Sequence, residues 1–89
     1  MIWTIEYDIV VQKQIKKLDP QTRNRIRSFL HERLAQLDNP RKIGEALKGS
    51  ELGNYWRYRT GDYRILCDIQ DNKLLVLVIE IGHRREVYR

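Results

Sequence analysis

Side chains that could bind an anion gather at the C-terminal end of the chain. Residues 79–89 read IEIGHRREVYR, in which an apolar run meets Gly82 and is followed by His83, three arginines and Tyr88. Arginine presents a planar fork of donors that matches phosphate or carboxylate, and histidine titrates near neutral pH. The combination predicts a site for a negatively charged ligand. Each of two residues keeps an alternative to a role in this site. His83 could be an ordinary surface residue, and Tyr88 could be a tyrosine at the edge of the core.

Three stretches in the second half of the chain have the alternation typical of β-strands. They are YWRYR (55–59), YRILCDIQ (63–70) and LLVLVIEI (74–81). The short turn sequences Thr60-Gly61-Asp62 and Asp71-Asn72-Lys73 separate them. Strands joined by such short turns pair with their neighbours, so we expect an antiparallel meander.

Alternation also assigns the side chains of these strands to two faces. On the last strand one face is uniformly apolar, and we expect helices to cover it; its residues are Leu75, Leu77, Ile79 and Ile81. The open face then carries Arg57, Arg59, Arg64 and Arg84. Arginines delivered by separate strands indicate a surface for phosphate. The alternative is an ordinary solvated face on which Asp62, Asp68 and Glu80 pair with the arginines.

The N-terminal part of the chain predicts a strand and a first helix. Residues 2–7 alternate, with Trp3 and Ile5 on one face. A helix from Asp8 as N-cap to about Leu18 would place Val11, Ile15 and Leu18 on one stripe.

A second helix should follow directly, because Asp19-Pro20 is a typical N-cap and first-turn pair. We expect it to end at Asn39-Pro40 and to bury Ile26, Phe29, Leu30, Leu34 and Leu37. Residues 39–54 read as a loop anchored by Ala46-Leu47. The predicted fold is therefore α+β, in the order β-α-α-β-β-β. A helical hairpin packs on one face of a small antiparallel sheet, in a single domain over residues 1–89.

Composition narrows the functional classes. Lys and Arg number 17 against 12 acids, giving a net charge of +5, and the surface should attract phosphate backbones or acidic partners. No stretch approaches the ~20 apolar residues of a membrane span. The single cysteine, Cys67, excludes an internal disulfide, and no Cys/His spacing suits zinc. We expect a cytoplasmic protein without metal or cofactor and without a membrane partner.

The motifs of the second half, taken in order, resemble a known family. The LKG of residues 47–49, the hairpin WRYRTGDYRILCDI and the ending VLVIEIGHRREVYR are similar to those of the RelE/ParE toxin superfamily, in its RelE-like branch. The resemblance implies a microbial-ribonuclease-like fold and the toxin of a bacterial type II toxin–antitoxin system. RelE-like toxins cut mRNA in the ribosomal A site, using the RNA 2′-hydroxyl as nucleophile and leaving a cyclic phosphate. ParE-like toxins share the fold but poison DNA gyrase.

The resemblance also implies roles for individual residues. Arg64 would hold the scissile phosphate, Arg84 would stabilise developing charge or assist the leaving group, and Tyr88 would stack on a base or orient the nucleophile. The remaining candidates for binding RNA phosphates are Arg57, Arg59, Arg85 and Lys48.

The YWRYR run departs from the family pattern, because Arg57 stands where some relatives carry a lysine. An arginine is a poor general base. His83 is the obvious substitute as base or acid. Strand alternation places it towards the apolar face, but we expect Gly82 to break the strand and free the ring.

The resemblance implies partners as well: a cognate RelB-like antitoxin, the ribosome and mRNA, and operator DNA only through the toxin–antitoxin complex. Three functions stay open, namely a ribosome-dependent endoribonuclease, a gyrase inhibitor without nuclease activity, and an inactive toxin fold that serves only as a complex partner.

Overall fold

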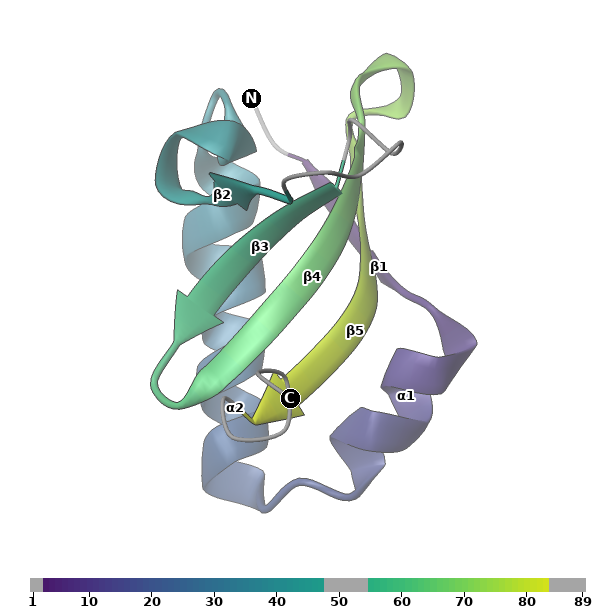
Figure 1. Ribbon diagram of the computed structural model, residues 1–89, viewed down its shortest axis with the longest axis vertical. Helices are drawn as coiled ribbons and strands as arrows, with labels where there is room; N and C mark the ends of the chain where they lie inside the picture. The colour runs from purple at the N-terminus through teal and green to yellow at the C-terminus, as the bar shows by residue number, and fades with distance from the viewer. Residues whose placement is uncertain (1–2, 48–54, 84–89) are drawn as a thin grey trace.

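The computed structural model describes residues 3–47 and 55–83 of the 89-residue chain. The strands are β1 (Thr4–Tyr7), β2 (Glu45–Ala46), β3 (Tyr55–Thr60), β4 (Tyr63–Gln70) and β5 (Leu75–His83). The α-helices are α1 (Ile9–Lys16) and α2 (Pro20–Ser28). Shorter helical turns are η1 (Phe29–Arg33), η2 (Leu34–Gln36), η3 (Pro40–Ile43) and η4 (Asp71–Lys73). The predicted α+β class is confirmed, with the helices packed on a five-stranded sheet (Figure 1).

The sheet has the strand order β1-β5-β4-β3-β2. The meander of β3, β4 and β5 is antiparallel, as the turn sequences predict. The expectation of a wholly antiparallel sheet is wrong, because β1 pairs in parallel with β5, with Thr4 opposite Leu75. This pairing places β5, the most apolar strand, in the interior of the sheet. Strands buried in this way read as near-continuous apolar runs, which fits LLVLVIEI.

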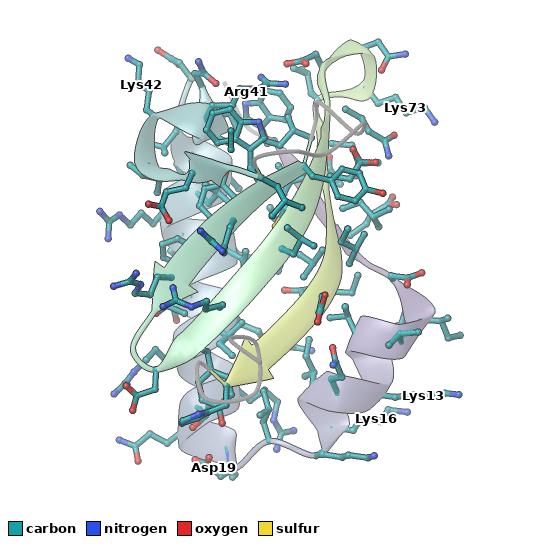
Figure 2. The ribbon with its side chains drawn as sticks, viewed as in Figure 1. Lys13, Lys16, Asp19, Arg41, Lys42 and Lys73 are labelled. Carbon is teal, nitrogen blue, oxygen red and sulfur yellow. The ribbon has the colours of Figure 1, made fainter. Side chains whose placement is uncertain are left out.

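The two helices lie on the same side of the sheet, where α2 runs behind β3 and β4 and α1 lies beside β5 (Figure 1). Asp19 caps α2, since its carboxylate accepts bonds of 3.1 Å from the Thr22 backbone amide and 2.7 Å from the Thr22 hydroxyl. These bonds hold the pKa of Asp19 below its ordinary value. Lys13 and Lys16 project from the outer side of α1 (Figure 2). The predicted helical hairpin and the Asp19 cap are confirmed. Asp8 precedes α1 as expected, but its side chain makes no cap hydrogen bond, and α1 ends at Lys16.

The second helix ends earlier than expected and changes its winding. Regular α-helix stops at Ser28, after which the backbone continues as a π-helical turn and then as a 3₁₀ turn to Gln36. Leu37 is extended, with φ −76° and ψ 148°, so the helical segment stops before Asn39-Pro40. The expected boundary is wrong by about one turn. Pro40 instead begins η3, with the Asn39 side chain accepting a bond from the Arg41 amide.

The predicted loop contains a short strand. Glu45 and Ala46 pair with Arg57 and Trp56, which adds β2 to the edge of the sheet. The Leu47 amide extends this pairing by donating to the Tyr55 carbonyl at 3.2 Å. Ala46 is exposed and Leu47 half-buried, so the expected apolar anchor is only partly realised.

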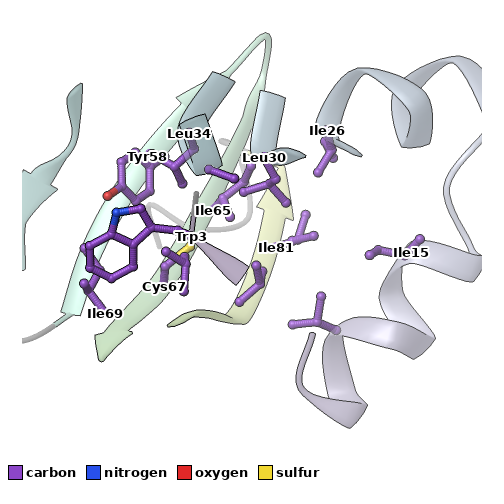
Figure 3. Packing of buried hydrophobic residues seen from close by; sticks show 14 residues of the cluster. Trp3, Ile15, Ile26, Leu30, Leu34, Tyr58, Ile65, Cys67, Ile69 and Ile81 are labelled. Carbon is purple, nitrogen blue, oxygen red and sulfur yellow. The ribbon is translucent and has the colours of Figure 1, made fainter. Parts of the chain in front are cut away.

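The core lies between the sheet and the helices (Figure 3). It includes Trp3 from the segment before β1, and Tyr58 and Cys67 from the meander. The helices contribute Val11, Ile15, Ile26, Leu30, Leu34 and Ala35. Strands β3 and β4 contribute Tyr58, Ile65, Cys67 and Ile69, and burial raises the pKa of the Cys67 thiol well above its ordinary value.

The faces of β5 differ from those expected. Val76 and Val78 are buried against the helices, whereas Leu75 and Leu77 lie on the other face and are half-buried. The register to β4 then shifts, because Val78 lies opposite Cys67 and Glu80 lies opposite Leu66, so Ile79 is an extra residue. Beyond this β-bulge Ile81 is buried. Simple alternation over the whole strand cannot describe a strand that changes face once.

Candidate functional site

A cavity of about 300 Å³ lies on the face of the sheet that no described helix covers. Its lining comes from four consecutive regions of the sheet: Leu47 after β2, Arg57 of β3, Arg64 and Leu66 of β4, and Glu80 of β5. Two guanidinium groups and one carboxylate therefore border a hollow with an apolar floor. Such an arrangement can hold a group that carries both negative charge and an apolar surface.

The strand register explains why these side chains meet. Arg57 lies opposite Leu66 and Leu66 lies opposite Glu80, so the three form one row across the sheet. The adjacent row on the same face is Arg59, Arg64 and Gly82. Arg64 therefore sits on the central strand, diagonal to both Arg57 and Glu80, and within the reach of long side chains. The prediction that Arg57, Arg59 and Arg64 share a face is confirmed.

Arg64 is 7% exposed and is the one buried charged side chain among the residues that the structure describes. Burying a guanidinium group is costly unless other groups bond to it. A fixed, buried arginine under a cavity has little conformational freedom to lose when an anion binds. It is therefore well placed to orient a phosphate group.

Arg57 is held less firmly. Its Nη2 atom donates to Glu45 Oε1 at 3.4 Å, which is long for a charge-assisted bond, and the Glu45 side chain is 68% exposed. Its Nε atom is buried without a hydrogen-bond partner among the described residues. The guanidinium group of Arg57 therefore keeps donor capacity for a ligand in the cavity.

His83 lies on the other face of the sheet. The expected break at Gly82 is wrong, because β5 continues through Gly82, which lies opposite Arg64, to His83, which lies opposite Tyr63. The imidazole meets the Tyr63 ring edge-on, with centroids 5.4 Å apart and an interplanar angle of 83°. It borders a separate groove of about 340 Å³, whose other lining includes Gln14 and Lys17 of the α1 region.

The structure thus brings together Arg57, Arg59 and Arg64 but not His83. Lys48, Arg84, Arg85 and Tyr88 lie outside the described residues, and their predicted roles stay predictions. The lining residues Leu47 and Leu66 were not predicted as site residues, although alternation places Leu66 on the face of Arg64. Glu45 was missed because its segment reads as a loop.

A second basic groove lies between the helices, away from this cavity. It has a volume of about 320 Å³ and is lined by Tyr7, Gln12, Ile15, Lys16, Arg23 and Arg27. The Tyr7 hydroxyl bonds to His31 Nε2 at 2.8 Å, and burial raises the pKa of Tyr7 above its ordinary value. The basic residues of the helices therefore form a surface distinct from the arginines of the sheet.

Residues 3–47 and 55–83 contain no cluster of His, Cys, Asp and Glu side chains that could hold a metal ion. Within the same ranges, no helix is long and apolar enough to span a membrane.

Comparison with known proteins identifies the class of protein that this fold and site define. The family model described as the ParE toxin of the type II toxin–antitoxin system parDE matches residues 5–88. The chain belongs to this family of toxins, within the RelE/ParE superfamily, as the sequence motifs predict.

Individual relatives are toxins or chains of toxin–antitoxin complexes. The toxin RelG of Mycobacterium tuberculosis is 27% identical over 89 residues, covering 100% of this chain and 99% of RelG. The toxin–antitoxin complex RelBE2 of the same organism contains a chain that is 25% identical, with a TM-score of 0.82, over 94% of this chain and 93% of that one. An arginine-to-alanine double mutant of the Escherichia coli toxin RelE is 26% identical with a TM-score of 0.77, over 99% and 92% of the two chains.

Proposed function

We propose that this toxin is a ribosome-dependent endoribonuclease that cleaves mRNA in the ribosomal A site and so inhibits translation. The observation that carries the proposal is the cavity on the open face, where Arg57 and Arg64 converge. The relatives named above, which include the E. coli toxin RelE and a chain of the RelBE2 complex, support the RelE-like branch.

Cleavage through the 2′-hydroxyl places additional negative charge on the phosphorus oxygens in the transition state. Fixed cations aimed at these oxygens stabilise that state more than they stabilise the substrate. Buried Arg64 would bind the scissile phosphate, while Arg57 and exposed Arg59 would bind the scissile group or its neighbour. This reaction draws on the nucleophile of the RNA itself and on arginines, and we propose that it is independent of metal.

We propose that residues outside the described part of the chain complete the site. Arg84 would stabilise charge at the leaving group, Tyr88 would stack on a base or orient the nucleophile, and Arg85 and Lys48 would bind flanking phosphates. His83 stays a candidate acid or base by family resemblance, but the imidazole would have to leave its contact with Tyr63 to reach the face of Arg64.

We further propose that a RelB-like antitoxin binds this chain. The structural relatives include a toxin–antitoxin complex from M. tuberculosis and the intact RelBE complex of E. coli, the latter 24% identical. A net charge of +5 favours an acidic partner. Operator DNA would be bound only through that complex, and the toxin alone would act on the ribosome and its mRNA in the cytoplasm.

The test is an in vitro translation reaction with purified toxin, followed by primer extension to map new 5′ ends on the mRNA. Discrete cuts at A-site codons that require ribosomes would support the nuclease. Intact mRNA with continued translation would reject it. A matched variant, Arg64→Ala, should remove the cuts if they come from the proposed site.

One observation favours a second candidate, because the family model that matches residues 5–88 is named for ParE. A ParE-like protein would inhibit DNA gyrase without cutting RNA. A gyrase supercoiling assay with the same preparation distinguishes the two, since a nuclease toxin should leave supercoiling unchanged.

A further inference from the structure

Glu80 supplies the one carboxylate that lines the arginine cavity among the described residues. We propose that Glu80 is the general base of RNA cleavage, which accepts the proton of the 2′-hydroxyl. The inference rests on the proposed nuclease function and assigns a step that the arginines cannot perform, since a guanidinium group stays protonated.

The β-bulge at Ile79 is what directs Glu80 into the cavity. Val76 and Val78 face the helices, so continued alternation would turn residue 80 towards the core as well. The extra residue reverses the order, because Glu80 lies opposite Leu66 while buried Ile81 lies opposite Ile65. Bulges near active sites often redirect a side chain in this way. Here the redirected side chain is an acid in a basic cavity.

The surroundings of Glu80 suit proton transfer. Arg57 and Arg64 face it across the cavity from β3 and β4. Glu80 also borders the groove beside α1, which is lined in part by Lys17, Tyr63 and His83. The side chain is exposed, so a carboxylate there can contact a bound nucleotide and exchange its proton with water.

The other candidate bases are placed less well. Glu45 lies outside the cavity lining and pairs with Arg57. The His83 ring is on the opposite face against Tyr63. Asp68 shares the open face but lies one row beyond Leu66, outside the cavity, and accepts a bond of 3.0 Å from Gln70.

The step balances without an added reagent. The Glu80 carboxylate takes the 2′-hydroxyl proton as the 2′-oxygen forms a bond to phosphorus. The bond between phosphorus and the 5′-oxygen breaks, and the 5′-oxygen takes a proton from water. The hydroxide so formed accepts the proton from Glu80, leaving a 2′,3′-cyclic phosphate and a free 5′-hydroxyl.

Single-turnover cleavage of mRNA on purified, programmed ribosomes tests the proposal, with wild type, Glu80→Gln, Glu80→Ala and the control Asp68→Asn. We expect Glu80→Gln to lower the cleavage rate by about 10²- to 10⁴-fold and Asp68→Asn to cleave at the wild-type rate. Both substitutions remove one negative charge from the same face, so a purely electrostatic effect would appear in both.

Three further readouts separate a base from a structural role. Added formate should restore part of the rate of Glu80→Ala. The fall in rate at acidic pH should be present in wild type and absent from Glu80→Gln. Binding to ribosomes carrying a 2′-deoxy A-site nucleotide should be retained by the variant, because only proton transfer is lost.

The outcomes distinguish the two proposals. If wild type cleaves and Glu80→Gln cleaves equally fast, the general-base assignment is wrong while the nuclease function stands. If Glu80→Ala is slow but insensitive to formate, and Glu80→Gln keeps the wild-type pH profile, the base role is also rejected. If wild type does not cleave programmed ribosomes, the nuclease function fails and the assignment with it.

Discussion

Arg59 and Arg64 lie directly opposite each other on β3 and β4, so two guanidinium side chains leave the same face of the sheet at neighbouring positions. Like charges in such positions destabilise a sheet by roughly 0.2–1 kcal/mol. We therefore expect the two guanidinium groups to repel each other, and an anion bound beside them would reduce that repulsion.

Substitution of the exposed member of this pair should have opposite effects on stability and on RNA binding. Arg59→Gln should raise the free energy of unfolding by about 0.2–1 kcal/mol, measured by urea denaturation. It should also lower the salt dependence of ribosome binding. The slope of the logarithm of the binding constant against the logarithm of the salt concentration should fall in magnitude by about 0.7 for one lost contact to single-stranded RNA. An unchanged slope would show that Arg59 contacts no phosphate.

Substitution of the buried member should mainly affect the chemical step. Arg64→Ala should lower the cleavage rate by about 10²- to 10³-fold, the usual effect of removing one donor from a transition-state site. Arg64→Lys should recover only part of the rate, because a lysine cannot make a bidentate contact. The control is Arg33→Ala, because Arg33 is exposed on the helical segment behind the sheet. This variant should cleave at the wild-type rate. Circular dichroism must show that the Arg64 variants are folded, and wild-type cleavage by folded Arg64→Ala would contradict the proposed site.

Gly44 is required because the Tyr58 ring fills the space beside it. A Cβ atom at residue 44 would lie 2.6 Å from Tyr58 Cε1 and 2.9 Å from Cζ. The ring cannot move easily, since it is 1% exposed and its hydroxyl donates a 2.8 Å bond to the Pro40 carbonyl. Gly44→Ala should therefore lower the free energy of unfolding by about 1–3 kcal/mol, measured by denaturant titration. The neighbouring substitution Ile43→Ala, at a 37% exposed position, should cost less than Gly44→Ala; equal costs would argue against the steric explanation.

Arg41, labelled in Figure 2, connects η3 to the β4–β5 turn through a bidentate pair with Asp71. Its Nη1 atom donates to Asp71 Oδ1 at 2.9 Å, and its Nη2 atom donates to Asp71 Oδ2 at 2.7 Å. The hydrogen bonds from Arg41 hold the pKa of Asp71 below its ordinary value of 3.8. A carboxyl group whose pKa is lower in the folded than in the unfolded chain stabilises the fold at pH values above its pKa in the unfolded chain. This contribution is lost as the pH falls through the pKa of the folded state. Because Asp71 is 61% exposed, the contribution should be below about 1 kcal/mol.

A double-mutant cycle measures this coupling. The substitutions Arg41→Gln and Asp71→Asn, alone and combined, should give a coupling energy that is constant at neutral pH and vanishes in acid below the ordinary carboxyl range. A coupling energy that does not change between neutral and strongly acidic pH would show that the charge of Asp71 is not its source.

Much of the fold follows from local sequence. The turn sequences around Gly61 and Asn72 delimit the meander correctly, and Asp19-Pro20 places the start of α2. Alternation assigns β3 and β4 to their faces because both strands are regular over their whole length. These features depend on near neighbours, which a single sequence displays directly.

The remaining features depend on long-range pairing. The parallel partner of β1 lies almost a whole chain length away, and β2 is too short to show a period of its own. The bulge at Ile79 is a property of the β4–β5 pair and not of either strand alone. For that reason the sequence places Arg57, Arg59 and Arg64 on the correct face, whereas Arg84 lies outside the described residues. It assigns the wrong face to Leu75 and Leu77, and it predicts that His83 leaves a strand that retains it.

The parallel pairing of β1 with β5 has a consequence for biosynthesis. Of the described strands, β1 is synthesised before the others, and its neighbour in the sheet is β5, which is synthesised after them. Strand β5 also supplies Glu80 to the cavity. During vectorial synthesis β1 must therefore stay unpaired in the sheet until β5 has emerged. If the toxin acts on ribosomes, this topology should delay assembly of the site until β5 has left the ribosome that is making it, because β5 supplies Glu80 to the cavity.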